Sequence, residues 1–454
     1  MRAIPTLKIS ISGVRGVVGA SLTPTLLTRF AQAFGTYVGG GRIVVGRDTR
    51  TSGEMVCQAV TAGLLSAGCR ILDLGVCPTP TVQLMVRRFQ ARGGVAITAS
   101  HNPAEWNALK FVGADGLFLS GASGRELLDI YHQGDYTRVA GDAMRQAERV
   151  EDALAVHVAA VLDATGPLPA RQPPLRVAID ACNGAGSIVS QQLLAALGVD
   201  VVANNVTPDG RFPRPAEPTP AALGQLSEAV RAGGCDIGFA QDMDADRLAV
   251  VDETGRPIGE DLTLLLACQR VLSVTPGPVV TNVATTHAIE AVAAACGCAV
   301  TRSAVGEANV TETMRRVGAV IGGEGNGGVI YPRINFARDS LVGMALILHR
   351  LAADGRSLSA IVAGIPALVM VKRQFACPSH RVGDVLRAAR AAYAGAPIDA
   401  RDGLKVTLPS GWFLLRGSNT EPIVRLIAEA ASEEAAAAIA DEAFARVAHA
   451  CVAG

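Results

Sequence analysis

The stretch Val95–Pro103, VAITASHNP, joins an apolar strand to a polar loop that could carry chemistry. The apolar run ends at Ala99, and Ser100 follows it on a turn that Asn102 and Pro103 close. Ligand sites in open α/β sheets lie just beyond the carboxyl ends of such strands. Ser100 is therefore a candidate nucleophile or phosphate carrier, although Ser-His-Asn-Pro is also ordinary turn chemistry.

The residues around this stretch alternate between strand and helix patterns. Strands are expected at 43–45 and 70–74 and helices at 53–66 and 79–88, and an alanine-rich helix over 145–162 closes the region. Such alternation is typical of a sheet with helices on its faces.

The alternation restarts twice after the proline-rich linker at 166–174, and the pattern changes to α+β from about residue 369. We therefore predict three similar mixed α/β domains of βαβ type and a smaller C-terminal α+β domain. The expected domains are 1–150, 151–255, 256–368 and 369–454.

Composition restricts the class of protein. The 454 residues are too many for a single core, and nearly half of them are apolar. A formal net charge of +0 with no basic run argues against nucleic acid or an anionic membrane as the partner. The sequence shows neither a signal peptide nor a membrane span, and its ten cysteines are scattered, so we expect a cytoplasmic protein with free thiols.

The segment DMDADR, residues 242–247, lies between two apolar strands. Asp242, Asp244 and Asp246 stand at alternate positions, so their side chains can point into one cavity. Carboxylates this close would repel unless a cation relieved them, and oxygen ligands at this density suit Mg²⁺. Arg247 could hold a phosphate oxygen. An acidic surface turn is the alternative.

Two further loops have the composition of ligand-binding segments. In GGEGNGG, residues 322–328, Glu324 and Asn326 suit sugar hydroxyls better than phosphate, which the carboxylate would repel. In RGSNTEP, residues 416–422, an arginine and two hydroxyls combine with Arg425 into a good anion cradle. A plain turn and a charged hairpin turn are the respective alternatives.

Four motifs in this order, TASHNP, DMDADR, GEGNGG and RGSNTEPIVR, resemble the signature loops of the α-D-phosphohexomutase family. That family includes phosphoglucomutases, phosphomannomutases and phosphoglucosamine mutases. SGVRG near the N-terminus resembles the family's opening loop, and HNPAEWNALK resembles the stretch from its serine to a lysine. The resemblance spans essentially the whole chain.

The resemblance implies four domains around a central cleft, a phosphoserine at Ser100 and Mg²⁺ as cofactor. The residues implied around the transferring phosphoryl group are Ser100, Arg15, His101, Lys110 and Arg247. The implied metal ligands are Ser100, Asp242, Asp244 and Asp246. The implied sugar-binding residues are Glu324, Asn326 and Glu307, and the implied phosphate-binding residues are Arg416, Ser418, Asn419, Thr420 and Arg425.

The implied activity is that of an isomerase, a phosphosugar mutase. It would interconvert hexose 6-phosphate and hexose 1-phosphate through a hexose 1,6-bisphosphate, which would also serve as activator. The partner would be a small sugar phosphate, and we expect a monomer or a homodimer that binds neither nucleic acid nor membrane.

The sequence departs from the family pattern in the sugar loop. Many relatives read Glu-x-Ser-Gly-His there, whereas Asn326 and Gly328 stand at the Ser and His positions here. Without that His, Lys110 and Arg15 become the candidates for an acid–base role. Glu307 stands where hexose-specific relatives have a basic residue or His. These departures favour the phosphoglucosamine mutase type and glucosamine 6-phosphate, with a phosphomannomutase or phosphoglucomutase of the same mechanism as the alternative.

Two alternative functions of other classes are also open. A phosphatase of the haloacid-dehalogenase type is one, because Asp242-Met243-Asp244 follows an apolar strand as that family's nucleophile does. It would leave the TASHNP loop without a role. The other is a non-catalytic sugar-phosphate sensor on the same scaffold, against which the intact nucleophile, metal and cradle residues argue.

Overall fold

The structure is a computed structural model that describes residues 6–10, 13–418 and 422–452. Two compact units divide the chain: Met1–Val271 with Asn326–Val362, and Leu272–Gly325 with Ala363–Gly454. The first unit is thus discontinuous in sequence, because its last 37 residues, 326–362, follow a segment of the second unit.

A seven-stranded sheet forms the N-terminal part of the first unit, with the strand order β1-β2-β6-β5-β3-β4-β7. The strands β3, β4, β5 and β7 run parallel, whereas β1, β2 and β6 pair antiparallel with their neighbours. The strands are β1 (Lys8–Ser10), β2 (Gly13–Val17), β3 (Gly41–Arg47), β4 (Cys69–Val76), β5 (Gly93–Ile97), β6 (Trp106–Gly113) and β7 (Ala147–Arg149).

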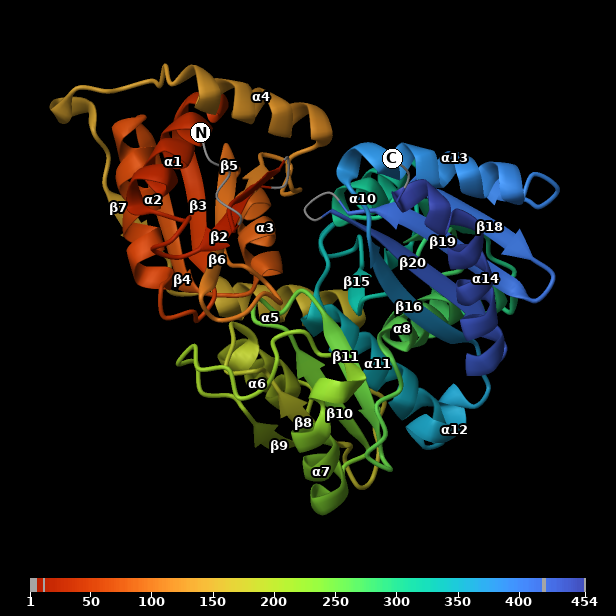
Figure 1. The fold of residues 1–454 in the computed structure, drawn as a ribbon. Helices are drawn as coiled ribbons and strands as arrows, with labels where there is room; N and C mark the ends of the chain where they lie inside the picture. The colour runs from red at the N-terminus through yellow and green to blue at the C-terminus, as the bar shows by residue number, and fades with distance from the viewer. Residues whose placement is uncertain (1–5, 11–12, 419–421, 453–454) are drawn as a thin grey trace. The chain divides into compact units, whose positions relative to one another are not determined.

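Helices cover both faces of this sheet (Figure 1). Side chains alternate along a strand, so Ile43 and Val45 pack into the cluster with α1, α2 and α4, while Val44 packs against α3. The helices are α1 (Pro24–Val38), α2 (Gly53–Ser66), α3 (Thr79–Arg88), α4 (Gly121–Gln133) and α5 (Ala153–Thr165), with the short 3-10 helix η1 (Gly141–Ala143).

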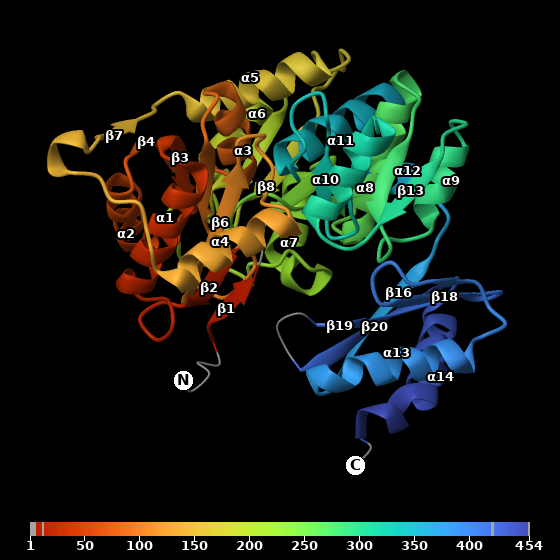
Figure 2. The same cartoon turned by 90° about the horizontal axis from the view of Figure 1, so that it is seen from above.

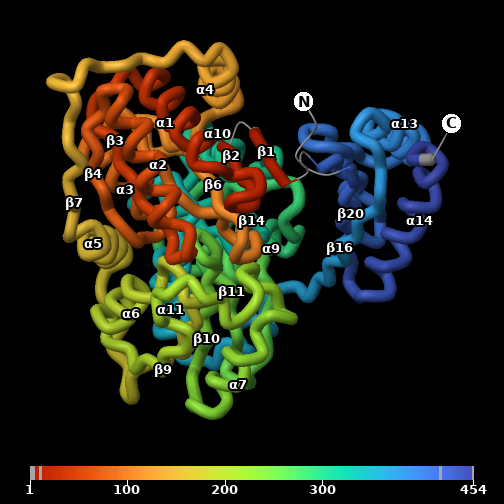
Figure 3. The backbone as a smooth tube through the Cα atoms, turned by 60° about the vertical axis from the view of Figure 1, so that its left-hand side comes forward, coloured from red at the N-terminus to blue at the C-terminus, as the bar shows by residue number. Residues whose placement is uncertain are grey.

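The helix expected over 145–162 is wrong in its first part. Residues Ala147–Arg149 form β7, and the helix α5 begins only at Ala153. The register Ile71↔Ala147 shows that β7 adds an edge strand to the sheet, so pairing with β4 overrides the local helix pattern. Figure 3 shows the chain continuing from β7 through α5 towards the second sheet.

The second sheet has the order β11-β10-β8-β9 and carries the acidic loop. The strands β10 and β11 form an antiparallel hairpin, and the loop 242–247 connects them. The elements are β8 (Arg176–Asp180), α6 (Gly186–Ala196), β9 (Asp200–Asn204), η2 (Pro220–Ala222), α7 (Gly224–Gly233), β10 (Ile237–Gln241) and β11 (Leu248–Asp252). The first unit also contains, in its later segment 326–362, the elements β15 (Gly328–Ile330), α11 (Ser340–Asp354) and α12 (Leu358–Val362).

The second unit contains a parallel group of strands, β13-β12-β14, and a five-stranded antiparallel sheet. The elements of the first group are β12 (Val279–Asn282), α9 (Ala288–Ala294), β13 (Val300–Ser303), α10 (Glu307–Val317) and β14 (Ile321–Glu324). The helix α8 (Glu260–Val274), most of which belongs to the first unit, precedes them.

The antiparallel sheet has the order β16-β20-β19-β18-β17, and α13 and α14 pack on one of its faces (Figure 2). Its elements are β16 (Val369–Ala376), η3 (Ser379–Arg381), α13 (Val382–Ala392), β17 (Ile398–Asp399), β18 (Leu404–Leu408), β19 (Gly411–Gly417), β20 (Ile423–Ala430) and α14 (Glu433–Val452). The predicted fold class, mixed α/β followed by α+β, is confirmed. Across the described ranges, no helix combines the length and the apolar character that a membrane span requires.

Candidate active site

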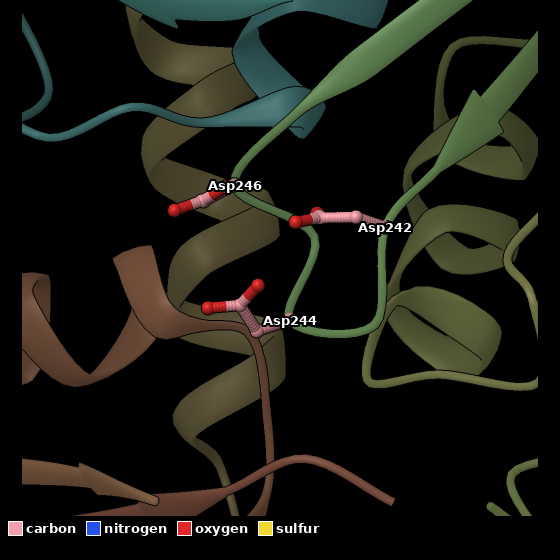
Figure 4. Close-up of side chains that lie close together, drawn as sticks. All are labelled: Asp242, Asp244 and Asp246. Carbon is pink, nitrogen blue, oxygen red and sulfur yellow. The ribbon is translucent and has the colours of Figure 1, made fainter. Parts of the chain in front are cut away.

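The acidic loop gathers three buried carboxylates at the turn between β10 and β11. One oxygen from each of Asp242, Asp244 and Asp246 lies within 4.8 Å of the others, and all three residues are at most 1% exposed. Ala245, with φ of 54°, makes the turn tight enough for alternate side chains to converge. Figure 4 shows the three side chains directed towards a common space.

The hydrogen bonds of this cluster leave oxygens available to a cation. Within the described ranges, Oδ1 of Asp244 and Oδ1 of Asp246 are buried and accept no hydrogen bond. Burial of an unpaired carboxylate oxygen is costly, and oxygens are the ligands that Mg²⁺ prefers. The three residues therefore fit a divalent cation.

Asp244 is held in place through its other oxygen. Thr79 Oγ1 and Lys110 Nζ donate to Asp244 Oδ2 at 2.6 and 2.7 Å. Burial and the neighbouring carboxylates raise the pKa of Asp242 well above its usual range. Burial would also raise the pKa of Asp244, but the Lys110 ammonium outweighs it and lowers that pKa.

Ser100 lies directly against this cluster. Its Oγ donates to Asp242 Oδ2 at 2.7 Å, and its backbone N–H donates to Thr98 Oγ1 at 2.9 Å. Ser100 is 7% exposed and has φ of 48°, a left-handed conformation that is uncommon for a residue with a side chain. Strain of this kind clusters at functional sites, where the surrounding structure has to maintain it.

Arg50, which is not among the site residues predicted from the sequence, maintains the Ser100 loop. Its guanidinium donates to the carbonyl oxygens of Ser100 and Asn102 at 2.7 Å each, and also to those of Pro103 and Trp106. The side chain is fully buried beside the carboxylate of Asp48, at 3.0 Å. The signal in the sequence was a charged pair, Asp48 and Arg50, directly after a buried strand.

The other cations predicted for the phosphoryl group lie around the same loops. Arg15 Nη1 donates to the side chain of Asn102 at 3.4 Å, and the backbone N–H of Arg247 donates to Asp242 Oδ1 at 3.2 Å. Burial, together with Arg247 and Lys110, lowers the pKa of His101 to about 3. His101 is therefore neutral at physiological pH and adds no charge.

Lys110, on β6, contacts two of the acidic side chains. Its Nζ lies 2.7 Å from Asp244 Oδ2 and 3.8 Å from Asp246 Oδ2. Burial would lower the pKa of Lys110, but these two carboxylates outweigh it and raise that pKa. Arg338, which is also absent from the predicted site residues, donates to the same Asp246 oxygen at 2.6 Å.

The predicted sugar-binding residues divide between the two units. Glu324 is buried at the end of β14, where Oε1 accepts hydrogen bonds from Asn282 Nδ2 and the Gly306 N–H at 2.8 and 2.9 Å. Glu307, the first residue of α10, is 8% exposed. Asn326 belongs to the first unit, and its Oδ1 accepts from the N–H of Gly328.

The predicted phosphate cradle lies at the end of the β19–β20 hairpin. Arg416 and Arg425 are directly opposed in the antiparallel register, which places both side chains on one face of the sheet. Arg416 Nε also donates to Asp402 Oδ1 at 2.8 Å. Two opposed arginines are a suitable arrangement for an anion. Ser418 is described, whereas the predicted Asn419 and Thr420 lie outside the described residues.

The chain is similar to known proteins along most of its length. Four phosphoglucomutase/phosphomannomutase family models match in order: alpha/beta/alpha domain I at 7–138, domain II at 157–255, domain III at 259–368 and the C-terminal domain at 375–446. The chain is also 39% identical to a probable phosphoglucosamine mutase of Methanopyrus kandleri, over 97% of each chain. The chain belongs to this phosphohexomutase family.

Members of the family are mutases, so this phosphohexomutase is an isomerase. It is 37% identical to a Thermococcus kodakarensis protein named phosphoglucomutase/phosphomannomutase, over 93% of this chain and 94% of that one. A solved structure of a phosphoglucomutase/phosphomannomutase family protein from Burkholderia thailandensis matches with a TM-score of 0.86 and 29% identity, over 99% of this chain and 98% of that one. The resemblance inferred from the four loops is confirmed.

Proposed function

We propose that this phosphohexomutase interconverts hexose 6-phosphate and hexose 1-phosphate through a phosphoserine at Ser100. The observation that carries the proposal is the 2.7 Å contact between Ser100 Oγ and Asp242 Oδ2. It places a hydroxyl that could carry phosphate against three carboxylates that could hold a divalent cation. Phosphoryl transfer depends mainly on positioning and on neutralisation of charge, and this arrangement supports both.

The first half of the reaction moves the phosphoryl group from Ser100 to the free hydroxyl of a hexose monophosphate. The bond between phosphorus and Ser100 Oγ breaks and a bond to the sugar oxygen forms. The proton of the sugar hydroxyl passes to Ser100 Oγ, and a hexose 1,6-bisphosphate results. Mg²⁺ held by Asp242, Asp244 and Asp246 with a phosphoserine oxygen would neutralise charge on the phosphoryl group. The Nζ of Lys110, 2.7 Å from Asp244 Oδ2, contributes positive charge there.

The second half returns the other phosphate of the bisphosphate to Ser100 after the sugar has turned end for end. During each half, the phosphate that is not reacting needs a separate binding site. Arg416 and Arg425, opposed on one sheet face, are suited to it together with Ser418. Free hexose 1,6-bisphosphate would rephosphorylate an empty Ser100 and thus act as activator.

The proposed preferred substrate is glucosamine 6-phosphate. Two buried acidic residues, Glu324 and Glu307, support it, because a protonated 2-amino group forms charge-assisted hydrogen bonds with carboxylates. Such a bond contributes roughly 1.5–3 kcal/mol, which corresponds to a preference of about one to two powers of ten. Activity on glucose or mannose phosphates would remain detectable, and the name of the Thermococcus kodakarensis relative favours these as the alternative substrates.

The test is a panel of the 6-phosphates of glucosamine, glucose and mannose, with kcat/KM for conversion to each 1-phosphate. We expect glucosamine 6-phosphate to have the highest kcat/KM. If glucose 6-phosphate or mannose 6-phosphate has the highest value, the mutase activity stands and the substrate preference is wrong. Peptide mass spectrometry of the purified protein separates the other classes: phosphate on Asp242 would indicate a phosphatase of the haloacid-dehalogenase type, and no turnover of any sugar phosphate would indicate a sensor.

A further inference from the structure

We infer that Arg338 supplies a fixed positive charge to the phosphoryl-transfer site, and that Gly328 lacks a side chain because the stem of Arg338 occupies that space. The inference rests on the proposed function, since it assigns Arg338 to the same site. It concerns a residue outside the four motifs.

The guanidinium of Arg338 lies within the acidic cluster. Its Nη2 donates to Asp246 Oδ2 at 2.6 Å, and the side chain is 11% exposed. Lys110 Nζ lies 3.8 Å from the same oxygen. Two cations thus approach one oxygen of Asp246, while Asp246 Oδ1 accepts no hydrogen bond from the described residues. An arginine remains protonated throughout the accessible pH range, so this charge is permanent.

The space beside Gly328 is filled by Arg338. A Cβ atom at position 328 would lie 2.3 Å from Arg338 Cδ and 2.8 Å from its Cγ. These atoms belong to the middle of the side chain, so they could move aside only if the guanidinium moved with them. Gly328 is not among the residues with positive φ, so its backbone conformation does not require glycine. The absence of a side chain at 328 is therefore explained by space.

Hydrogen bonds on both sides of Arg338 fix its position. Ile330 and Arg338 form an antiparallel bridge, and the Asp339 N–H donates to the Val329 carbonyl at 2.8 Å. Ser340 Oγ then donates to the Ala245 carbonyl, inside the acidic loop, at 2.6 Å. Arg338 is consequently held between β15 and the acidic loop.

Asp339 adds a second anchor to the same segment. Its Oδ2 lies 2.7 Å from Nε2 of the buried His157, whose Nδ1 contacts Thr81 Oγ1 at 2.8 Å. This connects the residue after Arg338 to α5 and α3.

Charge balance decides which role Arg338 has. In the acidic cluster, Asp242, Asp244 and Asp246 face three cationic side chains, those of Lys110, Arg247 and Arg338. Loss of Arg338 would leave the carboxylates with less counter-charge, so a divalent cation would bind more tightly. The same loss would remove positive charge near a transferring phosphoryl group, so transfer would slow. A merely structural residue would instead weaken both metal binding and turnover.

The experiment compares the wild type with Arg338→Met in two measurements. Calorimetric titration of the dephosphorylated proteins with Mg²⁺ should show a dissociation constant about five- to tenfold lower in the variant, as expected for loss of one nearby charge in a partly exposed site. The kcat of the mutase reaction should fall about ten- to a hundredfold. Arg333→Met, an exposed arginine of the same segment, is the matched control and should change neither value.

A second variant tests the relation to Gly328 without removal of the charge. Gly328→Ala should lower kcat towards that of Arg338→Met by displacement of the guanidinium, and the double variant should show little further loss because both changes act on one group. Arg338→Lys should restore part of kcat. It also serves as the folded comparison if Arg338→Met is unstable.

Three results would overturn the inference: unchanged kcat in Arg338→Met, weaker Mg²⁺ binding that accompanies the loss of kcat, or additive losses in the double variant. If the wild type turned over no hexose phosphate, the proposed function would fail by itself. The calorimetric titration would then still decide whether Arg338 contributes charge to the cation site.

Discussion

Arg50 Nη2 lies 2.7 Å from the carbonyl oxygen of Ser100. The same buried guanidinium donates to three further carbonyl oxygens of the loop, those of Asn102, Pro103 and Trp106. One side chain therefore determines where the loop lies and stabilises the left-handed backbone of Ser100. Arg50 is therefore a positioning residue, which affects Ser100 through the position of the loop.

Replacement of Arg50 by Lys should reduce kcat while KM changes little. Lysine has a single terminal nitrogen and cannot reproduce a planar fork of donors, so several loop carbonyls would lose their partners. Each buried group left without a hydrogen bond costs about 1–3 kcal/mol, so Tm should also fall. Steady-state kinetics and thermal unfolding test this, with the exposed Arg42→Lys as the control. A rise in KM with unchanged kcat would contradict the positioning role.

Replacement of Ser100 by Ala should abolish the covalent step. We expect kcat to fall by about three or more powers of ten, as when a nucleophile is removed. Intact-protein mass spectrometry should show one phosphate on the wild type after incubation with hexose 1,6-bisphosphate and none on the variant. A variant that still gained phosphate would place the acceptor elsewhere.

Replacement of Asp244 by Asn should weaken the divalent cation while the fold survives. The amide keeps the shape of the side chain and can still accept from Thr79, but it removes one negative charge of the cluster. We expect cation affinity to fall about ten- to a hundredfold and turnover to fall with it at low Mg²⁺. Activity measured over a range of Mg²⁺ concentrations checks this, with the exposed Asp209→Asn as control. Wild-type turnover that survives complete chelation would refute the metal requirement.

Replacement of Asp402 by Asn should raise KM more than it lowers kcat. Asp402 accepts from Arg416 Nε through one oxygen and from the Val305 N–H through the other, at 2.8 and 2.9 Å. The adjacent N–H, that of Gly306, donates to Glu324, so Asp402 connects the predicted phosphate cradle with the predicted sugar-binding Glu324.

The amide would leave Arg416 without its charged partner and free to adopt other rotamers. We expect a KM increase of about three- to tenfold, the scale of one charged hydrogen bond partly lost. Arg416→Lys should raise KM as well, because the bidentate fork is lost. The control is Asp399→Asn, three residues away on β17. If Asp402→Asn and Arg416→Lys both kept the KM of the wild type, the phosphate would bind elsewhere.

Lys405 should make stability depend on pH above neutrality. It is buried, with Nζ 3.6 Å from the ring centroid of Trp412, and burial together with Arg302 lowers its pKa to about 7. Between pH 7 and about 10.5 the unfolded chain therefore binds a proton that the folded chain does not, so this group increases stability as pH rises through that range. The Tm of the wild type, measured at pH 6, 8 and 10, should rise with pH relative to the Tm of Lys405→Met. A constant difference in Tm would show that Lys405 is protonated throughout.

The sequence predicted the strands and loops that carry local patterns. The alternation of apolar segments located β3, β4 and β5, and the three aspartates at alternate positions identified the acidic cluster. It did not locate α11, which is buried along almost its whole length and so has no amphipathic stripe. The edge strand β7 was missed because its partner, β4, lies more than 70 residues away in the chain.

Residues that act through distant contacts also escaped prediction. Arg50 and Arg338 follow no motif, and their roles depend on carbonyl and carboxylate groups that approach only in the folded chain. Gly328 illustrates the same limit of prediction from sequence. The sequence revealed that it lacks a side chain, but only the position of Arg338 explains why.

The discontinuity of the first unit has a consequence for biosynthesis. A nascent chain that has emerged only to residue 325 already contains Ser100 and all three aspartates, yet it lacks Arg338 and the Ser340 hydroxyl that bonds to the acidic loop. The intervening segment, 272–325, must therefore be synthesised before the first unit can close around its own carboxylates. Until then, three negative charges would face one another without the last of their counter-ions, so competence to bind metal and accept phosphate would arise late in translation.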